Sequence, residues 1–201
     1  MVYSRQRDLL ITEPAHHIAM IETATQWVVD RYPQNSLHLV RALEWLDRIA
    51  PGSAGPVRLA TLTHDMERAF PGPDQPVWNG NEDVEYYIAH SNRSARIVGA
   101  WLGEQAADAE LIGQVEDLIK VHEFGGWPEA DLVQAADSLS FLDVNIDLFL
   151  GFVRTGRFTA AQVQAKFDYS HNRIRIPQLR DLSLPMLERA TARLRTELVN
   201  A

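Results

Sequence analysis

The segment that decides the fold is LATLTHD, residues 59–65. Its small and apolar residues lie within a helix that we expect over residues 57–70, and the run ends in the polar pair His64 and Asp65. Beyond this segment, apolar positions recur at helical spacing along almost the whole chain, and clusters of glycine and proline separate the helices. The sequence therefore predicts an all-α fold, a bundle of about eight helices.

The expected helices follow from this periodicity and from capping residues. They cover residues 13–31, 36–50, 57–70, 81–103, 107–123, 128–154, 159–171 and a last segment from 183 to about 198. Their starts carry recognisable signals: a capping polar side chain, early acidic residues, or a proline in the first turn, at Thr12, Asn81, Thr159 and Ser183-Pro185. Strand signals, repeats and linkers are nearly absent, so we expect one domain over residues 1–201.

The composition limits the function. Hydrophobic residues make up 46% of the 201 residues and charged residues 23%, which are ordinary globular proportions. The chain has no cysteine, which excludes disulfides and thiolate ligands, so any metal must be held by nitrogen and oxygen. The net charge of −8 argues against a nucleic-acid polymer and favours a small substrate. With no signal peptide and no apolar run of membrane-spanning length, we expect a cytoplasmic protein without a membrane partner.

Histidines and acidic residues recur in the expected helices or at their ends. In chain order they are His38, His64-Asp65, His90, His122-Glu123 and Asp137. A single helical histidine is usually an ordinary core or surface residue. Here, however, apolar residues follow at helical spacing, which points several of these side chains inward. Buried imidazoles and carboxylates need partners, and a shared metal ion supplies one for all of them.

This pattern resembles the HD superfamily. In that family a histidine, a His-Asp pair and a distant aspartate on successive helices bind a metal; here the matching residues are His38, His64, Asp65 and Asp137. The small-apolar run before His64 and the triplet Ala136-Asp137-Ser138 also resemble the family's motifs. The resemblance covers about residues 36–149, which would form the metal-binding core. The helix at 13–31 and the helices over 159–198 would pack on this core.

The additional His90 and His122 resemble the branches of the family that bind two ions. The resemblance implies that metal one takes His38, His64, Asp65 and Asp137, and that metal two takes His90, His122 and the second oxygen of Asp65. Two divalent ions are thus expected, and nitrogen and oxygen ligands suit iron, manganese, cobalt, nickel or zinc. Three or four protein ligands per ion leave positions for water and substrate, as in catalytic sites.

The reaction that this resemblance implies is hydrolysis of a small phosphorylated substrate, with His64 and Asp65 as catalytic residues. Residues 154–180 contain six basic side chains and one acidic side chain, which could be either a phosphate-binding surface or a solvated face paired with acids elsewhere. The candidates for contact with the substrate anion are Lys120, Lys166, Arg173 and Arg68. The loop FGGW, residues 124–127, must be tight, and we expect it to border the pocket, although its glycines also suit a simple helix end.

Two rival functions remain open. The same six ligands also resemble the mixed-valent di-iron oxygenases of the superfamily, and the ligands alone do not separate oxygenation from hydrolysis. A non-catalytic module that only binds a ligand is the other alternative, but it would not require all six ligands. A homodimer is left open as the oligomeric state.

Overall fold

The computed structural model describes residues 15–80 and 83–199, and within these ranges all regular secondary structure is helical. The all-α prediction is confirmed, because the described residues form nine α-helices and one short 3-10 helix and none lies in a strand. The elements are α1 (Ala15–Arg31), α2 (Ser36–Ile49), α3 (Gly55–Thr63), η1 (Met66–Ala69), α4 (Val84–Glu104), α5 (Ala109–Lys120), α6 (Pro128–Val144), α7 (Ile146–Arg154), α8 (Ala160–Asn172) and α9 (Pro177–Val199).

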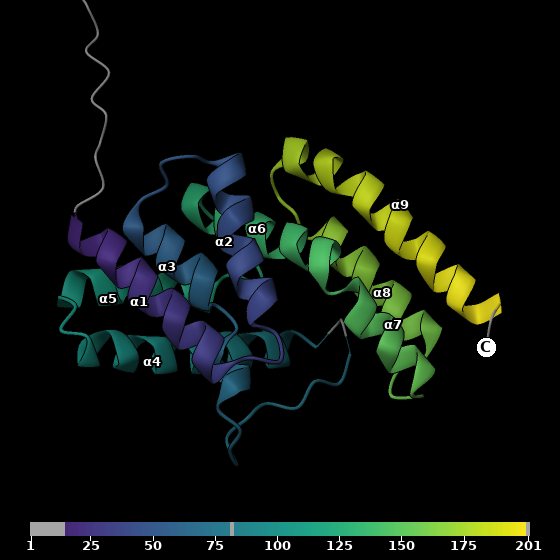
Figure 1. Cartoon of the computed structure of the whole chain (residues 1–201), viewed down its shortest axis with the longest axis horizontal. Helices are drawn as coiled ribbons and strands as arrows, with labels where there is room; N and C mark the ends of the chain where they lie inside the picture. The colour runs from purple at the N-terminus through teal and green to yellow at the C-terminus, as the bar shows by residue number, and fades with distance from the viewer. Residues whose placement is uncertain (1–14, 81–82, 200–201) are drawn as a thin grey trace, which may run out of the picture.

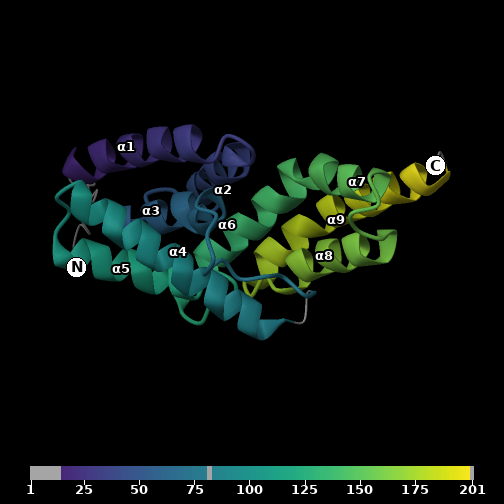
Figure 2. The ribbon, with the colours of Figure 1, turned by 90° about the horizontal axis from the view of Figure 1, so that it is seen from below.

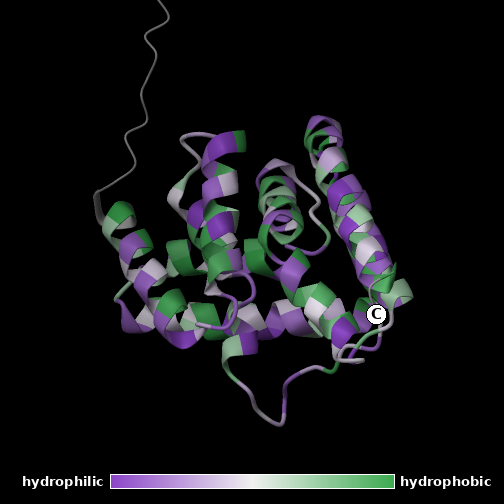
Figure 3. Cartoon of the chain, turned by 45° about the vertical axis from the view of Figure 1, so that its right-hand side comes forward, coloured by the Kyte–Doolittle hydropathy of each residue, from purple (hydrophilic) through white to green (hydrophobic). Residues whose placement is uncertain are grey.

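Helix α6 joins the two ends of an elongated bundle. Helices α1 to α5 lie on one side of it and α7 to α9 on the other (Figures 1 and 2). Buried residues lie all around α6, which packs against α2 and α3 as well as against α8 and α9. In contrast, α9 buries a single stripe, Ser183, Met186, Ala190 and Leu194, and carries hydrophilic residues along most of its length (Figure 3). The central helix therefore carries side chains that are buried between both ends of the bundle, and Asp137 is one of them.

Two expected helices are interrupted. The helix expected over residues 57–70 ends at Thr63, and after a turn at His64 and Asp65 the chain continues as η1. The helix expected over residues 128–154 is two helices, α6 and α7, divided at Asn145. Asparagine is a weak helix former because its amide competes for backbone hydrogen bonds. The first interruption matters for function, since it takes His64 and Asp65 out of the regular helix.

The last helix begins earlier than predicted. Helix α9 starts at Pro177, so the expected start at Ser183 and Pro185 is wrong and Pro185 lies inside the helix. Pro177 is the better start, because a proline in the first turn needs no hydrogen bond to its nitrogen.

Capping side chains agree with the sequence at some helix starts. Thr159 caps α8, as predicted, and it also forms a full capping box with Gln162. Asp83 caps α4 by accepting a hydrogen bond from the backbone N–H of Tyr86 at 2.9 Å. The predicted starts at Asn81 and Thr12 lie outside the described residues.

The buried apolar residues form two clusters. One gathers side chains of α1 to α6 and the other gathers side chains of α6 to α9, and Trp45 and Ile49 of α2 pack against both. Among the described helices, none is long and apolar enough to cross a membrane. A single domain and a cytoplasmic location stay predictions, and the oligomeric state stays open.

Candidate metal centre

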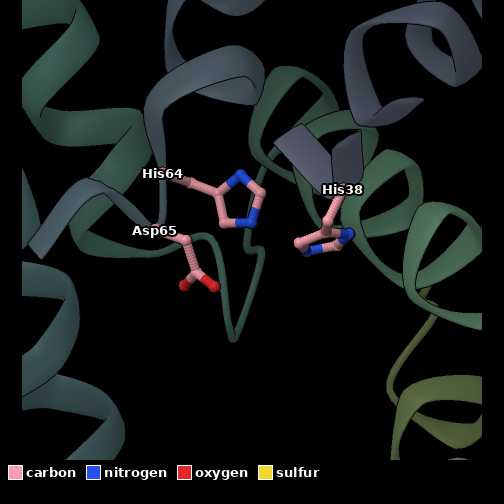
Figure 4. Close-up of side chains that lie close together, drawn as sticks. All are labelled: His38, His64 and Asp65. Atoms are coloured by element: carbon pink, nitrogen blue, oxygen red, sulfur yellow. The ribbon is translucent and has the colours of Figure 1, made fainter. Parts of the chain in front are cut away.

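The six predicted ligands converge in the interior. They come from five segments: His38 from the first turn of α2, His64 and Asp65 from the turn after α3, His90 from α4, His122 from just after α5, and Asp137 from α6. Figure 4 shows the His64 imidazole between the Asp65 carboxylate and the His38 imidazole. Side-chain atoms within 4.8 Å of one another form three overlapping groups: His38-His64-Asp65, His64-His122-Asp137 and Asp65-His90-His122.

Any two of these groups share one residue, so the six side chains form one continuous cluster. An ion bound at about 2.0–2.2 Å from each nitrogen or oxygen brings its ligand atoms within roughly 4 Å of each other, which the observed spacing allows. The middle group combines His122 with His64 and Asp137. The expected division into two sets of ligands does not contain that combination.

In all four histidines of the cluster, Nδ1 faces an oxygen atom. The Nδ1 atom of His64 lies 2.9 Å from the carbonyl oxygen of Thr61, and that of His122 lies 2.7 Å from the carbonyl oxygen of Ile119. The Nδ1 atom of His90 lies 2.9 Å from a carboxylate oxygen of Glu67. Because carbonyl and carboxylate oxygens only accept, each Nδ1 must carry a proton and donate it. Each Nε2 can then offer a lone pair.

The Nδ1 atom of His38 also carries a proton, because it donates a hydrogen bond to the hydroxyl of Ser140. The hydroxyl of Ser140 donates to the carbonyl oxygen of His38 at 2.6 Å, which uses its single proton. The Nδ1 of His38, 2.9 Å away, must therefore donate to that hydroxyl oxygen. Histidines that bind metals commonly have their second nitrogen fixed by an oxygen partner in this way.

The surroundings of the Nε2 atoms show whether the site suits a metal ion. Within the described part of the chain, those of His64, His90 and His122 are buried and have no partner in hydrogen-bond geometry, although the His90 atom lies 2.9 Å from a carboxylate oxygen of Asp65 and the His64 atom 3.4 Å from one of Asp137. That of His38 faces a carboxylate oxygen of Asp137 at 3.2 Å. A nitrogen lone pair and a carboxylate oxygen that face each other need a proton or a cation between them, and a buried polar atom left unpaired costs roughly 1–3 kcal/mol. The side chains present therefore fit a metal ion.

The two carboxylates of the cluster are held as anions. Burial alone would raise the pKa of Asp65, but Arg68 and His90 lower it well below its usual range. For Asp137, burial is again opposed, here by Arg173 and His64, and the pKa is well below its usual value. Both groups are thus ready to bind a cation at neutral pH.

The histidines differ in charge when no ion is bound. Burial lowers the pKa of His64, but the neighbouring Asp137 more than compensates and raises it to about 9. For His122, burial dominates and lowers the pKa to about 4 in spite of the adjacent Glu123. His122 is therefore a neutral ligand at pH 7, whereas His64 has to lose a proton before it can bind a metal.

A second layer of charged side chains surrounds these residues. The sequence singled out Arg173 as an anion contact but gave Glu67 and Glu123 no role. Glu67 contacts His90 and is paired with Arg93. Glu123 is 5% exposed and pairs with Arg173, which also pairs with Asp137. In the sequence, the only signal for these glutamates is their closeness to candidate ligands: Glu123 directly follows His122, and Glu67 lies two residues after Asp65.

The guanidinium of Arg173 is bound on all sides by side chains of the protein. Its two terminal nitrogens pair with Glu123 and Asp137, and its Nε donates to the hydroxyl of Ser138 at 2.8 Å. The side chain is 7% exposed, and the two carboxylates raise its pKa against the effect of burial. The predicted contact of Arg173 with a substrate anion would compete with these interactions.

The other predicted anion-binding residues lie in different settings. Arg68 is exposed beside Asp65, to which its Nε donates at 3.0 Å. Lys166 lies over the rings of Tyr169 and Phe141, and burial lowers its pKa. Lys120 pairs with Glu116 and Asp117 on its own helix. Of the four, Arg68 combines closeness to the cluster with exposure.

A pocket of about 270 Å³ opens beside the cluster. It shares Glu123 and Arg173 with the second layer, and its other walls are Val84, Tyr87, Phe124, Gln134, Tyr169 and Arg175. Phe124 belongs to the loop of residues 124–127, so this loop borders the pocket as expected.

The loop itself is held by Asp131. Gly125 has φ +67°, and the backbone N–H of Gly126 donates to the carboxylate of Asp131 at 2.8 Å.

The fold and the site together define an all-helical protein with a buried cluster of histidines and aspartates that could hold a metal. Comparisons of the chain with models of protein families, with curated proteins and with solved structures gave no match.

Proposed function

We propose that the protein is a metal-dependent phosphohydrolase of the HD superfamily that acts on a small phosphorylated substrate through two divalent ions. The observation that carries this proposal is the convergence of all six predicted ligands, in which the buried Nε2 atoms of His38, His64 and His90 face the carboxylates of Asp65 or Asp137. Sequence order and spatial position support each other, because these residues come from segments that are far apart in the chain.

The ligand set has capacity for more than one ion. Four imidazoles and two carboxylates exceed the four protein ligands that a single structural site uses, and Asp65 belongs to two of the three donor groups. Asp65 is thus the carboxylate proposed to serve both ions. When bound, two such ions would lower the pKa of a water molecule and stabilise the charge on a phosphoryl group.

The chain's own residues would complete the site. Arg68, exposed beside Asp65, would contact the phosphate, because a guanidinium can form two parallel hydrogen bonds with an oxyanion. The pocket beside the cluster would take the rest of the substrate, with Tyr87, Tyr169 and Phe124 as its aromatic walls. Lys166, over the Tyr169 ring, would add positive charge near this pocket.

The first experiment is a metal analysis of the purified protein, followed by a screen of phosphomonoesters and nucleotides with Mn²⁺, Co²⁺, Ni²⁺, Zn²⁺ or Fe²⁺. We expect metal-dependent release of phosphate. Oxygen consumption by iron-loaded protein, without phosphate release, would instead favour the oxygenase alternative. Metal binding without either reaction across the screen would favour the non-catalytic module.

Variants link activity to the cluster. We expect His64→Ala and Asp65→Ala to abolish phosphate release, because each belongs to two donor groups. His171→Ala is the matched control, since His171 contacts Ser183 at 2.7 Å and belongs to none of the donor groups. Unchanged turnover in the His64 and Asp65 variants would contradict the proposal.

A further inference from the structure

A buried glutamate lies behind His90, on the side away from the other ligands. Glu67 of η1 is two residues beyond Asp65 and is 1% exposed. One of its carboxylate oxygens accepts the Nδ1 hydrogen of His90 at 2.9 Å. The Nε2 atom of the same ring lies 2.9 Å from Asp65, inside the cluster. The His90 ring therefore lies between two carboxylates. Glu67 accepts the hydrogen of Nδ1 and fixes the orientation of the ring, whereas Asp65 faces Nε2 and is itself a candidate ligand.

The second carboxylate oxygen of Glu67 is bound by Arg93. This arginine follows His90 by three residues on α4, so both side chains project from the same face of that helix. Its NH1 donates to Glu67 Oε2 at 3.0 Å and to the backbone carbonyl of Glu67 at 2.9 Å. A carboxylate buried without a cation would be strongly unfavourable, and Arg93 removes that cost.

Arg93 also shapes the chain that follows the His-Asp pair. Its NH2 donates to the carbonyl oxygen of Phe70 at 2.7 Å and to the carboxylate of Asp74 at 3.0 Å. One guanidinium thus gathers residues 67, 70 and 74 around α4. These contacts are made from η1 and from the chain after it, beyond the end of α3 at Thr63.

We propose that Glu67 is a positioning residue for the metal centre: it fixes the His90 ring with Nε2 free to bind an ion, and Arg93 holds Glu67 in place. The inference rests on the proposed metal centre, but not on hydrolysis as its reaction. Carboxylates behind metal-binding histidines raise the basicity of the imidazole, and their loss typically lowers metal affinity by about 10- to 100-fold.

The test measures metal affinity directly, without substrate. Metal-free protein is titrated with Co²⁺ or Zn²⁺ in competition with a chromophoric chelator, for wild type, Glu67→Gln, His90→Ala and the double variant. We expect Glu67→Gln to weaken binding by about 10- to 100-fold. The same change in the His90→Ala background should have little further effect, because Glu67 acts through that ring.

Matched controls separate this role from general destabilisation. Glu85→Gln alters an exposed glutamate in the first turn of α4 and should leave the affinity unchanged. Arg93→Lys, compared with Arg96→Lys, provides a second route if Glu67→Gln does not fold, since Arg96 is 67% exposed and contacts only Asp74 among these residues. We expect Arg93→Lys to weaken metal binding and Arg96→Lys to leave it unchanged.

Two outcomes would overturn the proposal. One is a folded Glu67→Gln protein with wild-type metal affinity. The other is that Glu67→Gln lowers the metal affinity by the same factor in the wild-type and in the His90→Ala background. Wild-type protein that binds no ion would overturn both this inference and the proposed function. Wild-type protein that binds metal but hydrolyses no phosphoester in the screen would contradict the proposed function alone.

Discussion

At the scale of single residues, the orientation of the imidazoles carries the functional argument. The sequence indicates which histidines take part, but a histidine can present either ring nitrogen. In this structure an oxygen acceptor faces Nδ1 in all four rings, so Nε2 is the atom offered to an ion in each of them. Two of those acceptors are backbone carbonyls at the ends of α3 and α5, a feature that no sequence motif encodes.

The raised pKa of His64 predicts that metal binding depends on pH. With a pKa of about 9, His64 is protonated at neutral pH in the metal-free protein and must release that proton to bind an ion. The apparent affinity should therefore rise about tenfold per pH unit from near pH 7 and level off around pH 9. Calorimetric titrations in buffers with different ionisation enthalpies would measure the released proton. An affinity independent of pH over this range would contradict the assignment.

Replacement of Arg173 tests its role between two buried carboxylates. Arg173→Met removes the guanidinium that lies between the buried Glu123 and Asp137, and we expect the metal-free protein to lose about 3–5 kcal/mol of unfolding free energy. The control Arg175→Met removes a half-exposed partner of Asp131 and should cost less than about 1 kcal/mol. Denaturant titrations in the presence of a chelator measure both. Equal, small losses would show that the buried pairs contribute little.

At the scale of secondary-structure elements, the breaks between helices position the ligands. The turn after α3 carries His64 and Asp65, and the segment between α5 and α6 carries His122 and Glu123. The periodicity of apolar residues predicted that helices exist in these regions. It did not predict the interruption at residues 64–65, because apolar spacing continues into η1, where Met66 is buried.

Gly125 allows a prediction about the loop between α5 and α6. Its φ of +67° is strained for any other residue, and an added Cβ would lie 2.2 Å from the Asp131 carboxylate. We expect Gly125→Ala to lower the unfolding free energy by about 1–3 kcal/mol. The matched change Gly113→Ala lies inside α5 with no atom within 4 Å of the added Cβ, and should stabilise by about 0.5–1 kcal/mol. Thermal or denaturant unfolding distinguishes the two; a neutral Gly125→Ala would contradict the strain argument.

At the scale of the whole molecule, the metal centre would link distant parts of the chain. Its six ligands come from five segments between residues 38 and 137, and Arg173 joins the C-cap of α8 to two of the surrounding carboxylates. The second buried cluster, formed by α6 to α9, is thereby tied to the site through a charged side chain as well as through apolar packing.

This linkage predicts that metal stabilises the folded protein. An ion that binds only the native state adds about 2.7 kcal/mol when its free concentration is 100 times its dissociation constant. We therefore expect Mn²⁺ or Co²⁺ to raise the unfolding midpoint of metal-free protein and a chelator to reverse the shift. His64→Ala should remove most of this shift, whereas His171→Ala should retain it. A midpoint insensitive to metal in the wild type would count against a shared centre.

The sequence by itself determined the helical class and the identity of the six candidate ligands. Helical periodicity is a local property, and the order of histidines and aspartates is visible without coordinates. The sequence left the sixth expected helix undivided at Asn145 and placed the start of α9 six residues too late, because packing decides such boundaries.

Only the tertiary structure decided which atoms face one another. It brought Glu67 behind His90 and placed Arg173 between Glu123 and Asp137, although residues 123 and 173 are 50 positions apart. The physical reason is that partners for buried charge are selected by proximity in the folded chain. Proximity between distant segments depends on how the helices pack, and a local sequence pattern does not contain that information.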